Sequence, residues 1–427
     1  MGWLERWGPI APLLLAEFIV WLGFGALLPV LPLYFTQQGV DLAFLGLVIA
    51  AWPAARLVAE PFFGWLADRT ARVPLMVTGL VLGGVCGALP FVLTGPLWFL
   101  ALRAGAGLGA AIYDPAARGY LTDATPPERR GEAFGLYGAA QMGGLLLGPT
   151  IGGFGAATFG GMGFVFAFTA VTAILGAIAV ALRVREGPVA TRAPATHALE
   201  STEFPPDAPY LEGRLAADRE ARDHGARATA RAPARLLNRG LIAAIVINFG
   251  VYYASGTYEV VWSLFLARLG ADLALIGLTF ATFGLPVLLF SPVAGRIVDR
   301  RGALALIVVG SILPALAGIL YTFLTDPALA LPLILVESTG VALLSPALYV
   351  IVAANSPLGR SSTAQGLFGA AGTLGVIIAS LIAGALAGTN ILYPFYLFAA
   401  VMIGCLGAGL VVGGQRLRER PSGWRSI

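Results

Sequence analysis

The chain has 427 residues, of which 58% are apolar and 12% are charged, with 27 basic and 23 acidic side chains. About a quarter of the residues of a typical soluble domain are charged, so this composition excludes an ordinary water-soluble globular protein. The formal net charge of +4 is small and no basic block of a nucleic-acid-binding protein stands out, so we expect no nucleic acid among the partners.

Apolar runs that can cross a bilayer as helices, which takes about 20 residues each, follow one another in two groups of six. The first group occupies 10–36, 43–66, 74–94, 97–121, 131–157 and 162–183. The second group occupies 241–266, 273–297, 303–324, 328–353, 361–387 and 391–413. These runs predict an all-α polytopic membrane protein with twelve transmembrane helices.

The stretch between the two groups is polar. Residues 184–240 are rich in Arg, Ala, Pro, Asp and Glu, and we interpret them as a solvated linker with partial order. The predicted domains are therefore a six-helix bundle at 1–183, a linker at 184–240, a second six-helix bundle at 241–414 and a tail at 415–427.

Arginines gather on one face of this arrangement. That face carries Arg6, Arg69, Arg72, Arg129, Arg130, Arg300, Arg301, Arg360, the linker arginines and those of the tail. The opposite face has only Arg268, beside Asp272. Because loops rich in basic residues stay on the cytoplasmic side of a membrane, both termini, the linker and the tail are predicted to be cytoplasmic.

The two halves of the chain repeat each other. Turn and breaker residues recur at a constant offset of 231 residues, in the pairs Gly39/Gly270, Asp41/Asp272, Gly46/Gly277, Gly79/Gly310, Pro115/Pro346 and Gly153/Gly384. This agreement predicts one six-helix unit repeated in parallel topology. Such repeats are typical of transporters whose halves rock about a site near the bilayer midplane.

The loop after the second predicted helix carries a motif. Residues 64–72 read GWLADRTAR, and the equivalent residues 295–302 read GRIVDRRG. They resemble the signature loop G-x-x-x-D-R-x-G-R of the major facilitator superfamily and its degenerate second copy, with Ala71 where the family prefers glycine. The resemblance implies the major facilitator fold, in which twelve helices form two pseudo-symmetric six-helix bundles.

The same resemblance implies a gate on the cytoplasmic side. A glycine such as Gly64 lets two helices approach closely, and the loop charges can pair across the seam in one state and release in the other. Asp114 resembles the acidic residue that pairs with the loop arginine in related exporters. The predicted gating residues are Gly64, Asp68, Arg69, Arg72, Asp114, Asp299 and Arg300.

The fourth and fifth predicted helices carry two further motifs. Arg103 opens the run RAGAGLGAA, which resembles an arginine-led motif associated with proton transfer in proton-coupled members. Residues 144–153 read GLLLGPTIGG and resemble the antiporter motif of the drug:proton exporters, with Gly144, Gly148, Pro149, Gly152 and Gly153 at its fixed positions. The other interpretation is packing without directional meaning, because small residues at this spacing are common in membrane helices.

Seven ionisable residues fall inside predicted spans, where a charge costs at least about 2.5 kcal/mol and needs a partner or a cavity. They are Glu17, Arg56, Glu60, Arg103, Asp114, Glu259 and Glu337. Arg56 and Glu60 are four residues apart on one helix face, so we interpret them as neutralising each other. Glu17 has no cation within a turn or two, and an unpaired buried carboxylate can bind a proton or a cationic substrate in competition.

These residues do not follow the repeat. At the offset of 231 residues Glu17 corresponds to Asn248, and Glu337 corresponds to Ala106. The scaffold therefore repeats while the ionisable groups do not, which indicates that they belong to function. Five of the seven fall on helices 1, 4, 7 and 10, which line the central cavity in the fold that the resemblance implies.

We therefore predict a proton-coupled exporter of lipophilic, cationic small molecules that works by alternating access, as a monomer in the inner (plasma) membrane. Its partners would be the substrate, protons and the lipid bilayer. Aromatic rings near the carboxylates could hold a lipophilic cation by apolar contact and cation–π attraction. The predicted proton- and substrate-binding residues are Glu17, Trp21, Arg103, Asn248, Tyr252, Tyr253, Glu259 and Glu337.

Three alternatives remain open at this stage. The chain could export or flip a lipid-like molecule, or import a small solute such as a sugar, for which Gln141, Asn248 and Gln365 would supply hydrogen bonds. It could also be a sensor or scaffold whose linker binds a partner. An enzyme is not expected, nor is a cofactor or metal, because no paired nucleophile and base or metal-ligand cluster is visible.

Overall fold

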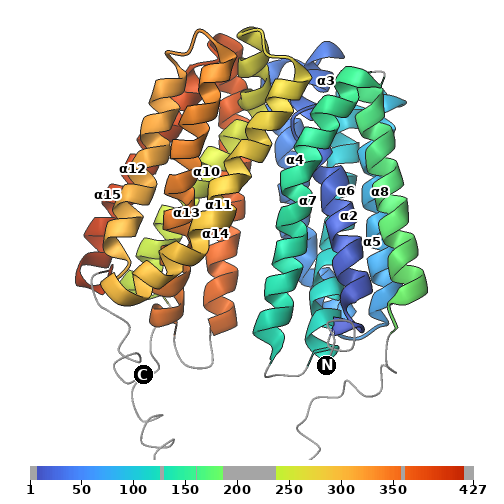
Figure 1. Ribbon diagram of the computed structural model, residues 1–427, viewed down its shortest axis with the longest axis horizontal. Coiled ribbons are helices and arrows are strands. Elements are labelled where there is room, and N and C mark those ends of the chain that lie inside the picture. The colour runs from blue at the N-terminus through green and yellow to red at the C-terminus, as the bar shows by residue number, and fades with distance from the viewer. Residues whose placement is uncertain (1–6, 126–128, 160, 186–236, 357–360, 418–427) are drawn as a thin grey trace, which may run out of the picture.

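The computed structural model describes residues 7–125, 129–159, 161–185, 237–356 and 361–417. Within these ranges the chain forms helices and no strand, which confirms the predicted all-α class (Figure 1). The predicted linker at 184–240 lies outside the described residues except at its two ends, and so does most of the predicted tail at 415–427.

Two bundles of helices stand side by side (Figure 1). The first contains α2 (Ala11–Leu27), α3 (Leu31–Gln37), α4 (Leu42–Ala67), α5 (Arg72–Ala88), η1 (Leu89–Phe91), α6 (Pro96–Asp123), α7 (Arg130–Thr158) and α8 (Met162–Arg183). The second contains α10 (Arg239–Arg268), α11 (Leu273–Arg301), α12 (Leu304–Tyr321), η5 (Pro327–Leu329), α13 (Ala330–Asn355), α14 (Ser361–Thr389), α15 (Tyr393–Gly413) and η6 (Gly414–Leu417).

The two bundles are copies of one arrangement. When α7 is shifted by the offset of the sequence repeat, both of its ends coincide with those of α14. Helix α2 packs on α7 and α8 as α10 packs on α14 and α15, and α6 packs on α4 and α5 as α13 packs on α11 and α12. The repeat predicted from the sequence is therefore confirmed in three dimensions.

The repeated breaker residues have a local structural reason. Gly39 and Gly270 have φ angles of +84° and +92°, a left-handed conformation that glycine adopts without a steric penalty. Two residues later, the Oδ1 atoms of Asp41 and Asp272 accept the backbone N–H of Phe44 at 2.9 Å and of Leu275 at 2.7 Å. The same turn and the same N-cap thus begin α4 and α11.

Loss of either N-cap should destabilise the protein by a similar amount. We expect Asp41→Ala and Asp272→Ala each to lower the free energy of unfolding by about 0.5–2 kcal/mol, because an orphan N–H of the helix loses its acceptor. Thermal unfolding of the detergent-solubilised protein measures this effect. Asp41→Asn is the control, since asparagine also caps helices; an Asn variant as unstable as the Ala variant would contradict the capping role.

The bundles share a buried core at one end of the molecule. One apolar cluster there combines α3 and α4 of the first bundle with α10 and α14 of the second, and includes the fully buried Phe35 and Phe395. At the other end the buried clusters are separate, one around Tyr120 of α6 and one around Leu348 of α13. The bundles therefore meet at the end where α4 and α11 begin, and part at the end that carries loop 64–72.

Two crossings close the joined end. Gly46 of α4 lies against Ser380 and Gly384 of α14, and a Cβ on Gly46 would come within 3.2 Å of the Gly384 Cα. The equivalent Gly277 of α11 lies against α7, where a Cβ would come within 3.3 Å of the Gly153 Cα. Both crossings bring backbone onto backbone, so a side chain has no room at either.

Ten helices in the described ranges are long and apolar enough to cross a membrane, and the pair α2 and α3, bent by 42°, would make an eleventh. The predicted span at 131–157 coincides with α7, but this glycine-rich helix is not among them. The count of twelve therefore stays a prediction. Apolar side chains such as Val58 and Val411 remain 80% and 85% exposed, as expected for surfaces covered by lipid.

Candidate functional site

The glycines of motif 144–153 have two separate contacts. Gly144, Gly148 and Gly152 face α2, where a Cβ would come within 2.5–2.7 Å of backbone carbonyl oxygens. Gly153 instead faces the carbonyl of Leu273 in α11, and Pro149 lies next to Gly277 of the same helix. The motif therefore presses α7 against its own bundle with one face and against the second bundle with the other.

Loop 64–72 is held to its own bundle. Arg72 is buried, and its Nη1 donates to Asp123 Oδ2 at the end of α6 at 2.6 Å. Its Nη2 lies 3.8 Å from Asp68 Oδ1, and the Asp68 side chain is 74% exposed. In this conformation the loop arginine thus ties α5 to α6.

Gly64 and Gly295 are not needed for close packing in this conformation. A Cβ on Gly64 would meet the Pro115 Cβ at 3.8 Å, an ordinary van der Waals contact, and a Cβ on Gly295 would meet nothing within 4 Å. The sequence interpretation that Gly64 allows two helices to touch is therefore wrong here. The physical reason is that the bundles part at this end.

Two other predicted gate residues, Arg69 and Arg300, lie at the surface. The Arg69 guanidinium lies 4.4 Å from the Trp65 ring centroid and donates to the Trp65 carbonyl at 3.2 Å. Arg300 is exposed at the end of α11. The side chain of Asp299 lies outside the described part of the structure. A gating role for these residues stays a prediction.

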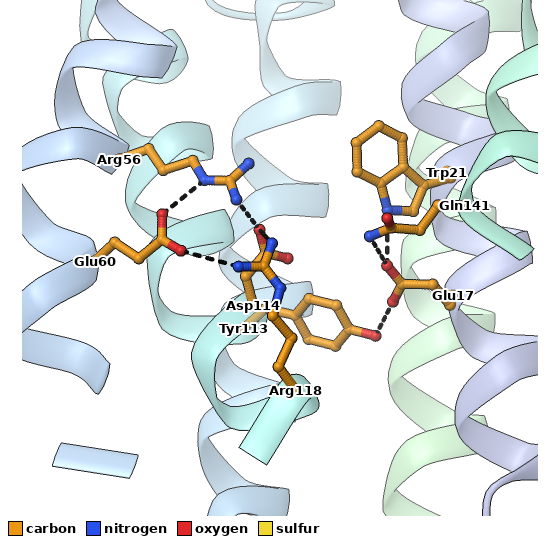
Figure 2. Close-up of polar contacts among 8 residues, drawn as sticks. All are labelled: Glu17, Trp21, Arg56, Glu60, Tyr113, Asp114, Arg118 and Gln141. Atoms are coloured by element: carbon orange, nitrogen blue, oxygen red, sulfur yellow. Dashed lines mark hydrogen bonds and ion pairs between the residues drawn. The ribbon is translucent and has the colours of Figure 1, made fainter. Parts of the chain in front are cut away.

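Asp114 has different partners from those that the family resemblance implies. It pairs with Arg56 of α4, and its Oδ2 lies 3.6 Å from Arg118 Nη2, one turn further along α6. Glu60 completes the group, with Oε2 at 3.0 Å from Arg56 Nε and Oε1 at 3.4 Å from Arg118 Nη1 (Figure 2). The expected pair of Asp114 with an arginine of loop 64–72 is therefore wrong in this conformation, because Arg56 and Arg118 pair with the carboxylate. The expected pairing of Arg56 with Glu60 is confirmed.

Asp114→Asn should be among the more destabilising substitutions in this group. Asp114 is only 4% exposed, and truncating one member of a buried ion pair leaves its partner uncompensated, at a cost of up to about 3–5 kcal/mol. Glu60 still faces Arg56, so we expect the lower end of that range. Unfolding of purified protein measures the loss, and Asp114→Asn combined with Arg56→Gln should cost less than the two single changes added. Additive losses would contradict a coupled pair.

Glu17 is fully buried on α2 and is surrounded by neutral donors. Its Oε1 accepts the Trp21 indole N–H at 2.8 Å and the Gln141 amide at 2.5 Å, and its Oε2 accepts the Tyr113 hydroxyl at 2.5 Å (Figure 2). Among the described residues no cation pairs with it. The predicted unpaired carboxylate is thus confirmed, and the structure adds that three helices, α2, α6 and α7, hold it in place.

A cavity opens beside this group, inside the first bundle and between α2, α4, α5, α6 and α8. The cavity has a volume of about 110 Å³. One water molecule needs about 10–15 Å³ on the same measure, so the cavity has room for several. Its walls are mainly apolar and include Trp21, Phe24 and Trp52, whose successive ring centroids are 5.3 and 5.4 Å apart. The charged or hydroxyl-bearing lining residues are Arg56, Arg103, Tyr113, Asp114 and Thr169.

Arg103 lines the same cavity from α6 and is 6% exposed. Its Nε has no hydrogen-bond partner, and no ion pair of its guanidinium occurs within the described ranges. The carboxylate that acts on it electrostatically is Glu259 of α10, in the second bundle. Arg103 and Glu259 therefore interact between the two bundles at a distance greater than that of an ion pair.

Glu337 does not join the other predicted binding residues. It is buried inside the second bundle, where its Oε2 accepts the Tyr321 hydroxyl of α12 at 2.7 Å. Around it lie the rings of Tyr258 and Trp262, in edge contact with Tyr321 at 6.4 and 4.8 Å. Neither Glu337 nor Glu17 is among the residues that line the cavity, and the two carboxylates have hydrogen-bond partners in different bundles. A shared role of the two in proton or substrate binding stays a prediction. The face of α13 that carries Glu337 turns toward α12.

Of the remaining predicted binding residues, two are buried in helix contacts and one is exposed. The buried Asn248 donates to the Phe368 carbonyl at 2.9 Å, which ties α10 to α14. Tyr253 is buried in the core at the joined end. Tyr252, by contrast, is 40% exposed.

Three partners were not identified from the sequence. Arg118 lies four residues after Asp114, and this helical spacing could have indicated the pair. Asp123 and Tyr321 have no such signal, because their partners Arg72 and Glu337 are on other helices. Only the packing of the helices brings them together.

Comparison with known proteins supports the family. The sequence profile of the Major Facilitator Superfamily matches residues 13–266 and 244–426. The quinolone resistance protein NorA of Staphylococcus aureus is 33% identical over 150 residues, which span 35% of this chain and 39% of NorA. Multidrug resistance protein 2 of Bacillus subtilis is 25% identical over 401 residues, or 92% of each chain.

Solved structures share the fold. A bacterial homologue of the human lysosomal transporter Spinster, in an inward-facing and unoccupied conformation, superposes with a TM-score of 0.72 and 15% identity over 98% of both chains. The nucleoside transporter NupG has a TM-score of 0.70 and 14% identity over 94% of this chain and 98% of NupG. With its repeated six-helix bundles, its signature loop and a profile match along almost its whole length, the chain belongs to the Major Facilitator Superfamily of transporters.

Proposed function

We propose that this transporter is a proton-coupled exporter, an antiporter of lipophilic molecules that carry a positive charge. The observation that supports this most is Glu17, a fully buried carboxylate with three neutral hydrogen-bond donors and no paired cation among the described residues. A buried carboxylate of this kind needs a positive partner, and a proton or a cationic substrate can serve.

The architecture supports alternating access. The bundles join at the end of Asp41 and Asp272 and part at the end of loop 64–72. If that loop is cytoplasmic, as the arginine distribution predicts, the conformation is inward-facing and both termini are cytoplasmic. The membrane that we propose is the inner membrane. Residues 64–72 and 295–302 would then close the cytoplasmic side in the opposite state.

Competition at Glu17 would supply the coupling. A proton that enters from outside neutralises the carboxylate, and release of that proton to the cytoplasm leaves a charge that attracts a cationic group. Return to the outward state then exchanges substrate for proton. Because Tyr113 bonds Glu17 while the adjacent Asp114 bonds Arg56, a change at Glu17 would reach the ion-pair group through two consecutive residues of α6.

The cavity supports a lipophilic substrate. Its lining includes three large aromatic rings, Trp21, Phe24 and Trp52, which offer apolar contact and cation–π attraction. This chemistry fits aromatic amphiphiles better than a sugar, which needs a wall of hydrogen-bonding groups. The names of the relatives, a quinolone resistance protein and a multidrug resistance protein, agree with export of such compounds.

Transport of a lipophilic aromatic cation tests the proposal. Proteoliposomes with an acidic lumen should accumulate ethidium, because protons that leave down their gradient drive the cation inward through an antiporter. Collapse of the pH gradient should abolish the accumulation. Equal accumulation with and without the gradient would exclude proton antiport.

A further inference from the structure

The buried side chain of Arg103 forms no ion pair with an anionic group among the described residues. The residue is only 6% exposed, and its Nε is buried and has no hydrogen-bond partner among the described residues. No ion pair or hydrogen bond of its other nitrogens is found in the described ranges. A buried charge without a partner is costly, and native proteins rarely retain one without a ligand or water to satisfy it.

The carboxylates in the surroundings of Arg103 do not pair with it in this structure. Asp114 is the one carboxylate in the lining of the cavity, and it already pairs with Arg56 and Arg118. Glu259 acts on Arg103 electrostatically but forms no ion pair with it. The guanidinium therefore lines the cavity without a carboxylate in ion-pair or hydrogen-bond contact, within the described part of the chain.

We propose that Arg103 binds the carboxylate of an aromatic substrate whose rings lie against Trp21, Phe24 and Trp52. A guanidinium presents its donors in a planar fork that matches a carboxylate, and such charge-assisted pairs are the strongest hydrogen bonds in proteins. Aromatic rings and one free guanidinium in a single cavity match an aromatic acid in both of its parts.

The position of Arg103 defines the substrate further. Arg103 and Asp114 are eleven residues apart on α6, which places them about 16 Å apart along the helix axis. Tyr113, at the Asp114 end, is bonded to Glu17. A substrate that used both ends would be an elongated zwitterion, with its carboxylate at Arg103 and its cationic group toward Glu17. This substrate class rests on the proposed export function.

Binding of two matched ligands tests the proposal. 2-Naphthoate and its neutral isostere 2-naphthamide differ in charge but hardly in shape. Calorimetric titration of the purified, detergent-solubilised protein should show that the wild type binds naphthoate at least about tenfold more tightly than naphthamide. Arg103→Gln should remove this preference, and Arg103→Lys should retain part of it because the charge remains. No preference in the wild type, or a full preference in Arg103→Gln, would overturn the proposal.

Two variants separate this role from others. Arg268→Gln removes an exposed arginine at the end of α10 and should keep the full preference, so loss of preference there would show that net charge alone decides. Glu259→Gln removes the carboxylate that acts on Arg103 and should strengthen naphthoate binding, whereas weaker binding would mean that Arg103 acts only through Glu259. If Arg103→Gln fails to fold, the naphthoate preference of Arg103→Lys is compared with that of the wild type instead, and an undiminished preference in Arg103→Lys would contradict the fork-shaped contact. Failure of ethidium transport with intact naphthoate selectivity would overturn the exporter and leave the site in place.

Discussion

Glu17→Gln should uncouple transport from protons. The amide keeps the size of the side chain and can still accept hydrogen bonds at its one carbonyl oxygen, but it can neither bind a proton nor form an ion pair with a cation. A hydrogen bond to a charged group contributes about 1.5–3 kcal/mol, and Glu17 accepts three. We therefore expect substrate-driven proton release from proteoliposomes to fall by at least about tenfold, because 1.4 kcal/mol corresponds to a factor of ten.

The matched control for this experiment is Glu132→Gln. Glu132 is an exposed carboxylate on α7, the helix that also carries Gln141. The Glu132→Gln variant should therefore show the same substrate-driven proton release as the wild type. Wild-type release by Glu17→Gln would rule out the coupling role of Glu17. Glu337→Gln is informative in the same assay, since Trp21 and Tyr113, which bond Glu17, line the cavity, whereas Tyr321, which bonds Glu337, does not; we therefore expect a smaller effect than that of Glu17→Gln.

Gly384→Ala should open the joined end of the bundles. A Cβ on Gly384 would collide with the Leu42 carbonyl and lie 2.8 Å from the Gly46 backbone. Overpacking of this kind costs about 1–3 kcal/mol, and the strain exists only where the two helices touch. The substitution should therefore shift the population about tenfold toward the state in which this end is apart, and slow transport accordingly.

Spin labels measure this shift. The exposed ends of α7 and α14 accept labels at Thr158→Cys and Thr389→Cys, in a background of Cys86→Ser and Cys405→Ser. Gly384→Ala should lengthen the distance between the labels. The control is Gly388→Ala, one turn further along the same helix, where a Cβ meets nothing within 4 Å. Equal distances in the two alanine variants would contradict a seam that depends on Gly384.

Local features of this protein were predictable because each depends on a few neighbouring residues. The pairs Gly39/Gly270 and Asp41/Asp272 specify a turn and an N-cap that need no distant partner. Apolar runs long enough for a bilayer predicted the helices, and the constant offset between repeated residues predicted two equivalent bundles. Pairs one helical turn apart, such as Arg56 with Glu60, were within reach for the same reason.

The contacts of the ionisable side chains depend on how the helices pack, which the sequence does not show. Placing Glu17, Glu259 and Glu337 on predicted cavity helices did not say which way each side chain points, because a small rotation of a helix moves a residue from the cavity to a neighbouring helix. Glu337 thus lies against α12, while Glu17 lies among donors from α6 and α7. Asp114 likewise took Arg56 as its partner because α4 packs directly on α6.

The sequence by itself thus determined that the chain is a repeated set of membrane helices, which segments form them, and which few charges the membrane must accommodate. Only the tertiary structure decided which charges meet, that the bundles are joined at one end, and that no described residue forms an ion pair or hydrogen bond with Arg103. The physical reason is that helix formation and insertion depend on contiguous residues. Pairing of buried charges depends instead on the rotation and crossing of helices that are distant in the chain.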